Sequence, residues 1–383
     1  MLIKEVYITN TSVFFPNEAV SNEDMESYLG YIDGKASRAK GIVLRNNGIK
    51  RRFYALTKEG KPTHTNAGMT SLAIKLLFKD TPQQFKNLQL ISCGTASPDQ
   101  MMPSHGVMVH GLLPETNGIE VVSQSGVCCS GMHAFKYAYM SIKTGEVQHA
   151  VATGSERSSA SLVSQTFEEE VYQLEQLQQN PCIGFEKDFL RWMLSDGAAA
   201  FLMSDKKNEI GLSLKVDWVE GVSFANKMET CMYMGGDKLP DGTLKSYLDY
   251  TPQELLSQSI LSVKQDVKLL SNNIVPLGAK GLKKALDKHG VSSDEIDYFL
   301  PHMSSIFFKE KIFKGLIENN MPIPYDKWFF NLSNVGNVGS ASPYLMVDEL
   351  FKSGRLKAGD KILLLVPESS RFSYIFSLLT VVE

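Results

Sequence analysis

The stretch GVCCSGMHAFKYAYMSIKTGEVQHAVATGSER, residues 126–157, decides the fold of this chain. Small residues around Cys129 are followed by a largely apolar segment, 132–143, which is typical of a helix. The turn KTGE then leads to the apolar residues 150–153, which have the composition of a buried strand. The stretch therefore predicts one helix–turn–strand unit with a cysteine where the helix begins.

The same unit recurs later in the chain. GSAS precedes a second helix-like segment, 343–352, and the turn KSGR joins it to the apolar segment 361–366. The glycines of the two turns, Gly145 and Gly354, lie 209 positions apart.

Another pair of units repeats with almost the same offset. The first has a helix at 69–78 and a strand at 88–93, and the second has a helix at 277–289 and a strand at 296–300. Ser97 and Ser305 follow these strands at positions 208 apart. Two units with nearly equal offsets predict an internal duplication.

The alternation of helices and strands predicts an α/β fold of two related halves, 1–206 and 207–383. The polar join lies near residues 204–208, after the strand 198–203. Residues 167–190 have no counterpart in the second half. We expect them to form a helical insertion, which either covers a substrate cavity or lies on the surface.

Composition excludes several classes of protein. With 383 residues, 43% of them apolar, the chain can bury a large core, and a net charge of -3 argues against nucleic-acid binding. The first residues lack the basic start and apolar stretch of a signal peptide, and no apolar run reaches the roughly 20 residues that span a bilayer, so we expect neither export nor a membrane span. Its five cysteines form no CxxC pair, so we expect reduced thiols, a cytoplasmic location and no metal or redox cofactor.

Cys129 is the candidate nucleophile. The positive end of a helix dipole lowers the pKa of a thiol at the helix N-terminus and so favours the reactive thiolate. We expect the adjacent Cys128 to be a small core residue, because neighbouring side chains point in different directions. A buried, unreactive Cys129 is the alternative, since most cysteines are core residues.

His302 and Asn337 are the candidate partners of this cysteine. His302 follows a strand, in PHMSS, where functional groups collect in α/β folds, and its imidazole can move protons. Asn337, in NVGNVGSAS, can donate a hydrogen bond to a thioester carbonyl. A structural histidine and an ordinary turn are the alternatives.

At this point the sequence resembles β-ketoacyl-acyl-carrier-protein synthase III. Six motifs occur in the order of that family: NGIKRR (47–52), TASPDQMMPS (95–104), CCSGM (128–132), LSDGAAAFLM (194–203), PHMSS (301–305) and GNVGSAS (336–342). The resemblance implies the thiolase fold, five αβαβα layers from two duplicated halves, in a homodimer. It also implies acyl-coenzyme A or acyl carrier protein as partners.

The resemblance assigns roles to the site residues. Cys129 takes the acyl group, with nearby backbone N–H groups as the oxyanion hole, and His302 and Asn337 polarise the second thioester for Claisen-type condensation. Arg51 or Arg52 matches a basic position near the coenzyme A entrance, with a solvated surface pair as the alternative. Ser340 is expected to bind substrate.

Two departures from the family pattern indicate a rebuilt pocket. His302 is followed by Met-Ser-Ser instead of Gln-Ala-Asn, and VPESSRF (366–372) replaces a glycine-rich loop. Glu156 resembles an extra acid/base found in some relatives, or else forms an ion pair with Arg157 or Arg371.

These features resemble the dialkylresorcinol-forming ketosynthase and cyclase group (DarB-like), which implies closure of a cyclohexanedione ring. The alternatives are a synthase that primes fatty acids with malonyl-carrier protein, an ester-forming acyltransferase and a non-catalytic acyl-binding or heterodimer partner.

Overall fold

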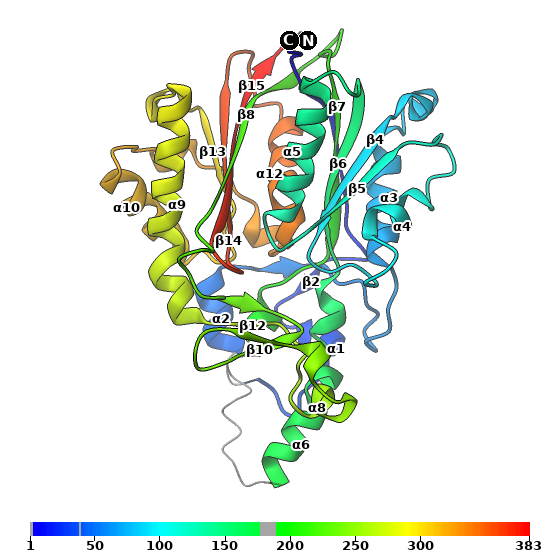
Figure 1. Ribbon diagram of the computed structural model, residues 1–383, viewed down its shortest axis with the longest axis vertical. Helices are drawn as coiled ribbons and strands as arrows, with labels where there is room; N and C mark the ends of the chain where they lie inside the picture. Colours follow the sequence, from blue (N-terminus) through cyan, green and yellow to red (C-terminus); the bar gives the residue numbers. More distant parts are fainter. Residues whose placement is uncertain (1–2, 38–39, 177–188) are drawn as a thin grey trace.

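The computed structural model describes residues 3–37, 40–176 and 189–383. Their main feature is a nine-stranded sheet with the order β13-β14-β15-β8-β1-β7-β6-β4-β5 (Figure 1). Its strands are β1 (Tyr7–Phe14), β4 (Leu90–Thr95), β5 (Glu120–Ser125), β6 (His149–Glu156), β7 (Gly197–Ser204), β8 (Ser213–Ser223), β13 (Tyr298–Pro301), β14 (Lys361–Glu368) and β15 (Ser373–Val382).

A short pairing of β1 with β8 joins the two parts of the sheet. β1 pairs with β8 only at Tyr7–Lys215 and Ile8–Leu214, whereas β7 pairs with β1 along most of its length. The strands therefore form two layers, β13-β14-β15-β8 and β1-β7-β6-β4-β5 (Figure 1). The predicted boundary at residue 206 falls in the connection between β7 and β8, and the internal duplication stays a prediction.

Helices fill the space between the two strand layers and cover their outer faces. α5 (Ser130–Lys143) and α12 (Ser342–Lys352) lie between them. α3 (Asn66–Leu77) and α4 (His105–His110) cover one outer face, and α9 (Val267–His289) and α10 (Phe308–Glu318) cover the other (Figure 1). This is the αβαβα layering that the sequence predicted.

The helix predicted at 277–289 is only the second half of α9. The helix begins ten residues earlier, because the Asp266 carboxylate accepts a hydrogen bond from the N–H of Leu269 (2.8 Å) and caps the first turn. Pro276 lies inside the helix, so the proline does not end it.

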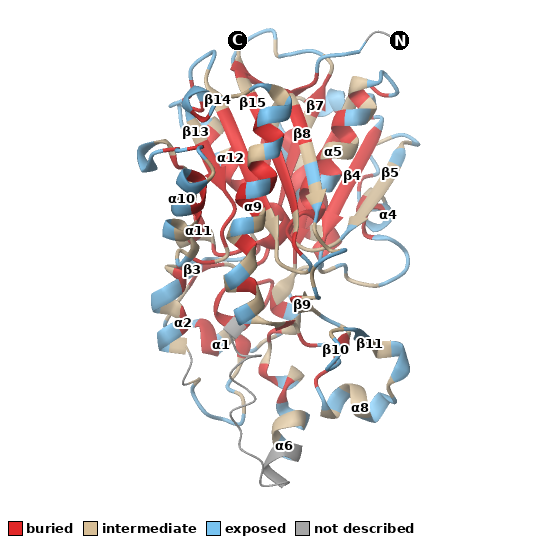
Figure 2. Ribbon diagram, turned by 60° about the vertical axis from the view of Figure 1, so that its left-hand side comes forward, coloured by how far each residue is buried: buried red, intermediate tan, exposed pale blue. Residues whose placement is uncertain are grey.

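The two central helices supply much of the core. The aromatic ring of Phe201 on β7 packs against Phe135 of α5 and Tyr344 of α12, with ring centroids 5.8 and 4.1 Å away. Figure 2 shows buried residues concentrated in the strands and in these helices. No helix in the described parts of the chain is long and apolar enough to cross a membrane.

Short elements form a cap at the end of the layers opposite the two chain termini (Figure 1). We use the word cap for the described residues within 15–65, 157–196 and 224–266. Its elements are β2 (Val20–Ser21), α1 (Met25–Leu29), α2 (Lys40–Asn47), β3 (Arg51–Arg52), α6 (Glu168–Gln176), β9 (Met232–Tyr233), β10 (Gly236–Lys238), β11 (Leu244–Ser246), α8 (Pro252–Ser257) and β12 (Lys264–Gln265). The predicted insertion 167–190 contains α6, and its residues 177–188 lie outside the described part.

Glycines allow the backbones of the central layers to approach closely. A Cβ atom on Gly131 or on Gly154 would lie 2.3 Å from the carbonyl oxygen of Ser340, and one on Gly94 would lie 2.2 Å from that of Ser130. Backbone atoms cannot move aside as the end of a flexible side chain can. Only glycine fits at these three crossings.

We predict that Gly154→Ala lowers the free energy of unfolding by about 3 kcal/mol or more, because the added methyl group forces the turn at Ser340 away from β6. Urea denaturation would measure the change. Gly118→Ala is the matched control, because a Cβ there would have no atom within 4 Å. Equal stability of the two variants would contradict the close approach.

Candidate active site

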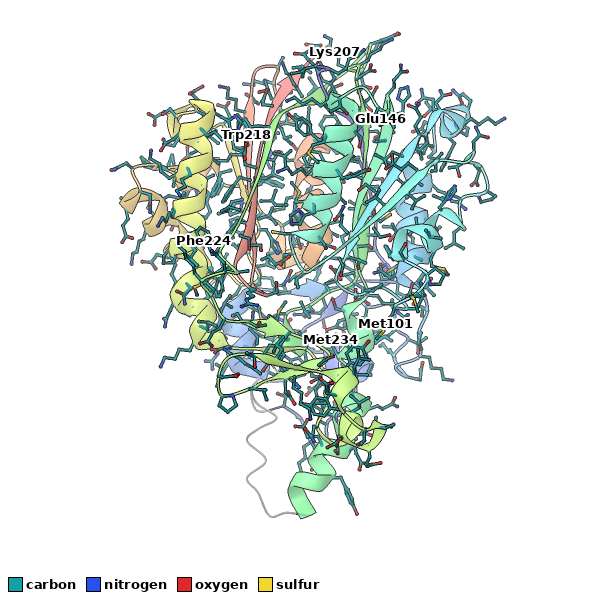
Figure 3. The ribbon with its side chains drawn as sticks, viewed as in Figure 1. Met101, Glu146, Lys207, Trp218, Phe224 and Met234 are labelled. Carbon is teal, nitrogen blue, oxygen red and sulfur yellow. The ribbon has the colours of Figure 1, made fainter. Side chains whose placement is uncertain are left out.

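A cavity of about 1240 Å³ lies where the cap meets the carboxyl ends of β4, β6, β13 and β14. Apolar residues of α9 and α10 line one part of it, including Ile274, Leu282 and Ile312. The cap lines another part. Figure 3 shows Met101 and Met234, both of the cavity wall, at the level of the cap. Three of the side chains singled out by the sequence line the cavity: Glu156, His302 and Asn337.

Both adjacent cysteines are buried, and the assignment of the nucleophile to Cys129 stays a prediction. Of the pair, only Cys128 lies in the cavity wall that the described residues form. Cys129 is fully buried, and its thiol donates a hydrogen bond to the carbonyl oxygen of Val366 on β14 (3.3 Å). The two side chains do point in different directions, as expected, but it is Cys129 that packs in the core.

The start of α5 explains why the two thiols point in different directions. Cys129 is the N-cap residue and already has nearly helical dihedral angles, φ −78° and ψ −13°. Its side chain therefore follows the helix face that packs against β14 and β15. Cys128 precedes the helix and turns toward the cavity.

Burial raises the pKa of both thiols well above the ordinary value, and the nearby Glu368 carboxylate raises both further. This effect of burial opposes the expected effect of the helix dipole, which stays a prediction. Both thiols are neutral near pH 7.

His302 follows β13, and its backbone N–H donates to the carbonyl oxygen of Leu365 (2.8 Å), which holds the turn against β14. Burial lowers the pKa of the imidazole to about 4. The ring is therefore neutral near pH 7, so that one ring nitrogen can donate a hydrogen bond and the other can accept one.

Asn337 lies between α11 (Leu332–Val335) and the start of α12, as the glycine-rich motif predicted. Its side-chain oxygen accepts a hydrogen bond from the N–H of Gly339 (3.0 Å). This contact orients the amide and leaves its NH₂ group as the donor for a ligand carbonyl.

Glu156 is the last residue of β6, and hydrogen bonds from neighbouring residues hold its carboxylate in place. Its carboxylate accepts from the N–H of Ala96 (3.1 and 3.2 Å), the hydroxyl of Ser97 (2.6 Å) and the N–H of Ser340 (3.2 Å). Burial raises its pKa, although these donors oppose the shift. A buried carboxyl with a raised pKa, in a cavity wall, is suited to proton transfer.

The predicted ion pair of Glu156 is not what the structure shows. Arg157 instead pairs with Asp99 (3.1 Å), and Arg371 donates from Nε to the carbonyl oxygen of Met228 (2.9 Å). Both contacts direct the guanidinium groups to other partners.

Three residues expected to bind substrate lie outside the cavity wall. Ser340 is fully buried, and its hydroxyl accepts from the N–H of Ser155 (3.2 Å), so it supports the site from behind. Arg52 is fully buried, with its guanidinium against Asn22 (2.5 Å) and the carbonyl oxygen of Trp192 (3.4 Å). Arg51 is exposed on β3, away from the wall. The consecutive arginines of a short strand alternate between inside and outside, which explains the outcome.

Sequence reasoning missed several charged side chains at the site, among them Lys245 and Glu368. Lys245 lies in the cavity wall, with its ammonium group 3.7 Å from the ring centroid of Tyr250. Glu368, in VPESSRF, accepts hydrogen bonds from the backbone on both sides of Cys128. The departure of that loop from the glycine-rich pattern was the available signal.

Within the described ranges, no group of three or more His, Cys, Asp or Glu side chains could hold a metal ion.

Comparisons with known proteins show which proteins this chain resembles. The family model "3-Oxoacyl-[acyl-carrier-protein (ACP)] synthase III C terminal" matches residues 286–366, which include His302 and Asn337. The β-ketoacyl-[acyl-carrier-protein] synthase III of Clostridium novyi (strain NT) is 24% identical over 361 residues, 94% of each chain.

Two solved structures superpose over almost the whole chain. The tetronic acid condensing enzyme AbyA1 covers 98% of this chain and 99% of its own, with a TM-score of 0.73 and 17% identity. A variant of Xanthomonas campestris OleA with bound lauric acid and lauroyl-CoA covers 99% and 100%, with a TM-score of 0.73 and 17% identity. The chain therefore has the thiolase-like α/β fold that the sequence predicted.

We predict that His302 makes the protein less stable in acid. Its pKa is about 4 in the folded state and about 6.5 when unfolded, so the unfolded state binds more protons between these values. The stabilising contribution of the neutral ring is present above pH 6.5 and is lost as the pH falls toward 4, at a cost of about 3 kcal/mol.

Urea denaturation of the wild type and of His302→Gln at several pH values would test this. The variant should lose less stability than the wild type between about pH 7 and pH 4. His149→Gln, at the start of β6 outside the cavity, should behave like the wild type. Parallel curves for wild type and His302→Gln would contradict the neutral buried ring.

Proposed function

We propose that this chain, a 3-oxoacyl-ACP synthase III-like acyltransferase, takes an acyl group from a coenzyme A or carrier-protein thioester and condenses it with a second acyl thioester. One observation carries the proposal: a cysteine thiol, a neutral imidazole and an oriented amide line the same cavity, from Cys128, His302 and Asn337. The sequence proposes Cys129 as the acyl carrier, and the cavity wall favours Cys128.

The first half-reaction is acyl transfer. The cysteine sulfur attacks the thioester carbonyl, a C–S bond to the enzyme forms, and the C–S bond to the carrier breaks. The thiol proton leaves with the carrier thiol. The neutral imidazole of His302, in the same cavity wall, can accept the thiol proton and return it to the carrier thiol.

The second half-reaction forms the C–C bond. His302 and the NH₂ group of Asn337 donate hydrogen bonds to the carbonyl of the second thioester, and so stabilise the negative charge that develops as its α-carbon becomes a nucleophile. The α-proton passes to a base of the cavity wall, for which Glu156 is the candidate. The α-carbon then attacks the acyl-cysteine, the C–C bond forms as the C–S bond breaks, and the sulfur takes up the proton as a thiol. A neutral imidazole suits this role, because one of its ring nitrogens carries a hydrogen that it can donate.

The apolar part of the cavity favours substrates with alkyl chains. α9 and α10 line it with aliphatic side chains such as Ile274, Leu282 and Ile312, and a volume of about 1240 Å³ exceeds what a short acyl unit needs. The OleA structure with lauric acid and lauroyl-CoA is a related fold that holds such chains.

We further propose that condensation is followed by ring closure to a cyclohexanedione, as in the dialkylresorcinol-forming group. Ring closure needs an additional proton transfer, and Glu156 is a buried carboxyl in the cavity wall with a raised pKa. AbyA1, a tetronic acid condensing enzyme, shares the fold.

A homodimer is the proposed assembly. β5 is the last strand in the sheet order, so one of its edges has no strand beside it among the described residues. Apolar side chains next to it are exposed, at Val107, Met108 and Leu112. Pairing of two β5 edges would cover both features.

Priming of fatty acid synthesis is the second candidate, favoured by the full-length similarity to the Clostridium novyi synthase. It would release carbon dioxide and a linear β-ketoacyl product. A non-catalytic acyl-binding partner is the third candidate, and the polar side chains gathered at the cavity argue against it.

Acylation of the cysteine pair can be tested by intact-mass analysis after mixing with lauroyl-coenzyme A. We expect an acyl adduct on the wild type and on Cys129→Ser, but none on Cys128→Ser, because only the Cys128 side chain lies in the cavity wall. Loss of the adduct in Cys129→Ser alone would return the role to Cys129. An adduct retained in both variants would exclude the pair.

The product can be identified by mass analysis after mixing a β-ketoacyl thioester with an unsaturated acyl thioester. We expect a cyclic dione from the wild type, and at least a tenfold loss of it in Glu156→Gln, which keeps an acceptor for the surrounding N–H groups but removes the acid. Glu146→Gln, at the end of the molecule away from the cap (Figure 3), is the control. A linear product with carbon dioxide from the wild type would favour the priming reaction.

A further inference from the structure

The carboxylate of Glu368 occupies the backbone N–H groups that flank Cys128. It ends β14, and its Oε2 atom accepts from the N–H of Val127 (3.1 Å) and from the N–H of Cys129 (3.2 Å). Its Oε1 atom accepts from the hydroxyl of Ser370 (2.7 Å). Three hydrogen bonds therefore hold one carboxylate beside the cysteine of the cavity wall.

These two N–H groups are suited to stabilise an oxyanion. They lie just before α5, a helix of 14 residues, where backbone N–H groups have no partner within the helix and the helix dipole is positive. An acyl group on Cys128 would bring its carbonyl oxygen near them. While Glu368 accepts both hydrogen bonds, that oxygen cannot use them.

The same carboxylate acts on the thiols electrostatically. Its negative charge disfavours a thiolate on Cys128 or on Cys129, in addition to the effect of burial. His133 of α5 also faces this carboxylate, and burial lowers its pKa, so it supplies no compensating positive charge. Glu156 adds a further negative group near Cys128.

We propose that Glu368 is a positioning residue that keeps the Cys128 thiol in its neutral, unreactive form. Its carboxylate caps the N–H groups of Val127 and Cys129, and an entering thioester carbonyl takes both hydrogen bonds from it. No covalent bond changes in this exchange, in which one acceptor oxygen replaces another. The role in substrate turnover rests on the acyl transfer proposed above.

Two substitutions separate the parts of this role. Glu368→Gln removes the charge but keeps an acceptor oxygen for the N–H groups, whereas Glu368→Ala removes both. The control is Glu220→Gln on β8, a carboxylate that pairs with Lys288 (2.6 Å). Ser370→Ala removes one hydrogen bond of the Glu368 carboxylate and leaves its charge.

The test is alkylation by iodoacetamide, with the rate at Cys128 followed by peptide mass analysis from about pH 6 to about pH 10. We expect the profile of Glu368→Gln to move about one unit toward lower pH, which is about tenfold faster alkylation on the acidic side. Glu368→Ala should move at least as far, Ser370→Ala less, and Glu220→Gln should match the wild type.

An unchanged profile in Glu368→Gln would overturn the proposal, and slower alkylation would show that the carboxylate assists the thiol instead. Glu368→Gln decides the question if Glu368→Ala fails to fold, which circular dichroism would show. Alkylation needs no thioester, so a shifted profile without acyl transfer would reject the proposed function and retain the proposed effect of Glu368 on the Cys128 thiol.

Discussion

The site depends on the close contact between backbones at the centre of the molecule. Gly131 at the start of α5 and Gly154 on β6 both approach the carbonyl oxygen of Ser340, and Gly94 on β4 approaches that of Ser130. A single added methyl group at any of them would overlap a main-chain atom. The contact therefore fixes the turn that holds Asn337 against the turn that holds Cys128, although the two are more than 200 residues apart in the chain.

Buried hydrogen bonds extend this contact into the cavity. The N–H of Ser340 donates to Glu156, and the hydroxyl of Ser340 bonds to the backbone of Ser155. Each partner is buried, so an unmet hydrogen bond would cost more than one at the surface. Glu156 is thus both a member of the cavity wall and a link between β6 and the turn that precedes α12. A carboxyl held in this way keeps one orientation, which general acid/base chemistry requires.

The sequence was sufficient for the layers and for most of the site, because both follow from regular patterns. Helix–turn–strand units predicted the elements that became α5, β6, α12 and β14, and motifs at strand ends located His302 and Asn337. Which of the two thiols lies in the cavity wall could not be predicted in this way. It depends on the residue at which α5 begins, and a shift of one residue reverses which thiol meets the cavity. The burial of Arg52 and Ser340 could not be predicted for a similar reason, since a motif does not show which side of the backbone faces inward.

The distribution of charge at the site disfavours an activated thiol. Burial keeps the thiols and the imidazole of His302 neutral, while Glu368 occupies the N–H groups at the start of α5. A thiolate, a free oxyanion site and an imidazolium would each be costly in a cavity with largely apolar walls. A thioester changes these terms together, because its carbonyl is a hydrogen-bond acceptor without a full charge and its alkyl chain displaces water. The energy that activates the nucleophile would then come from binding of the substrate, and the chemistry would begin only when the cavity is filled.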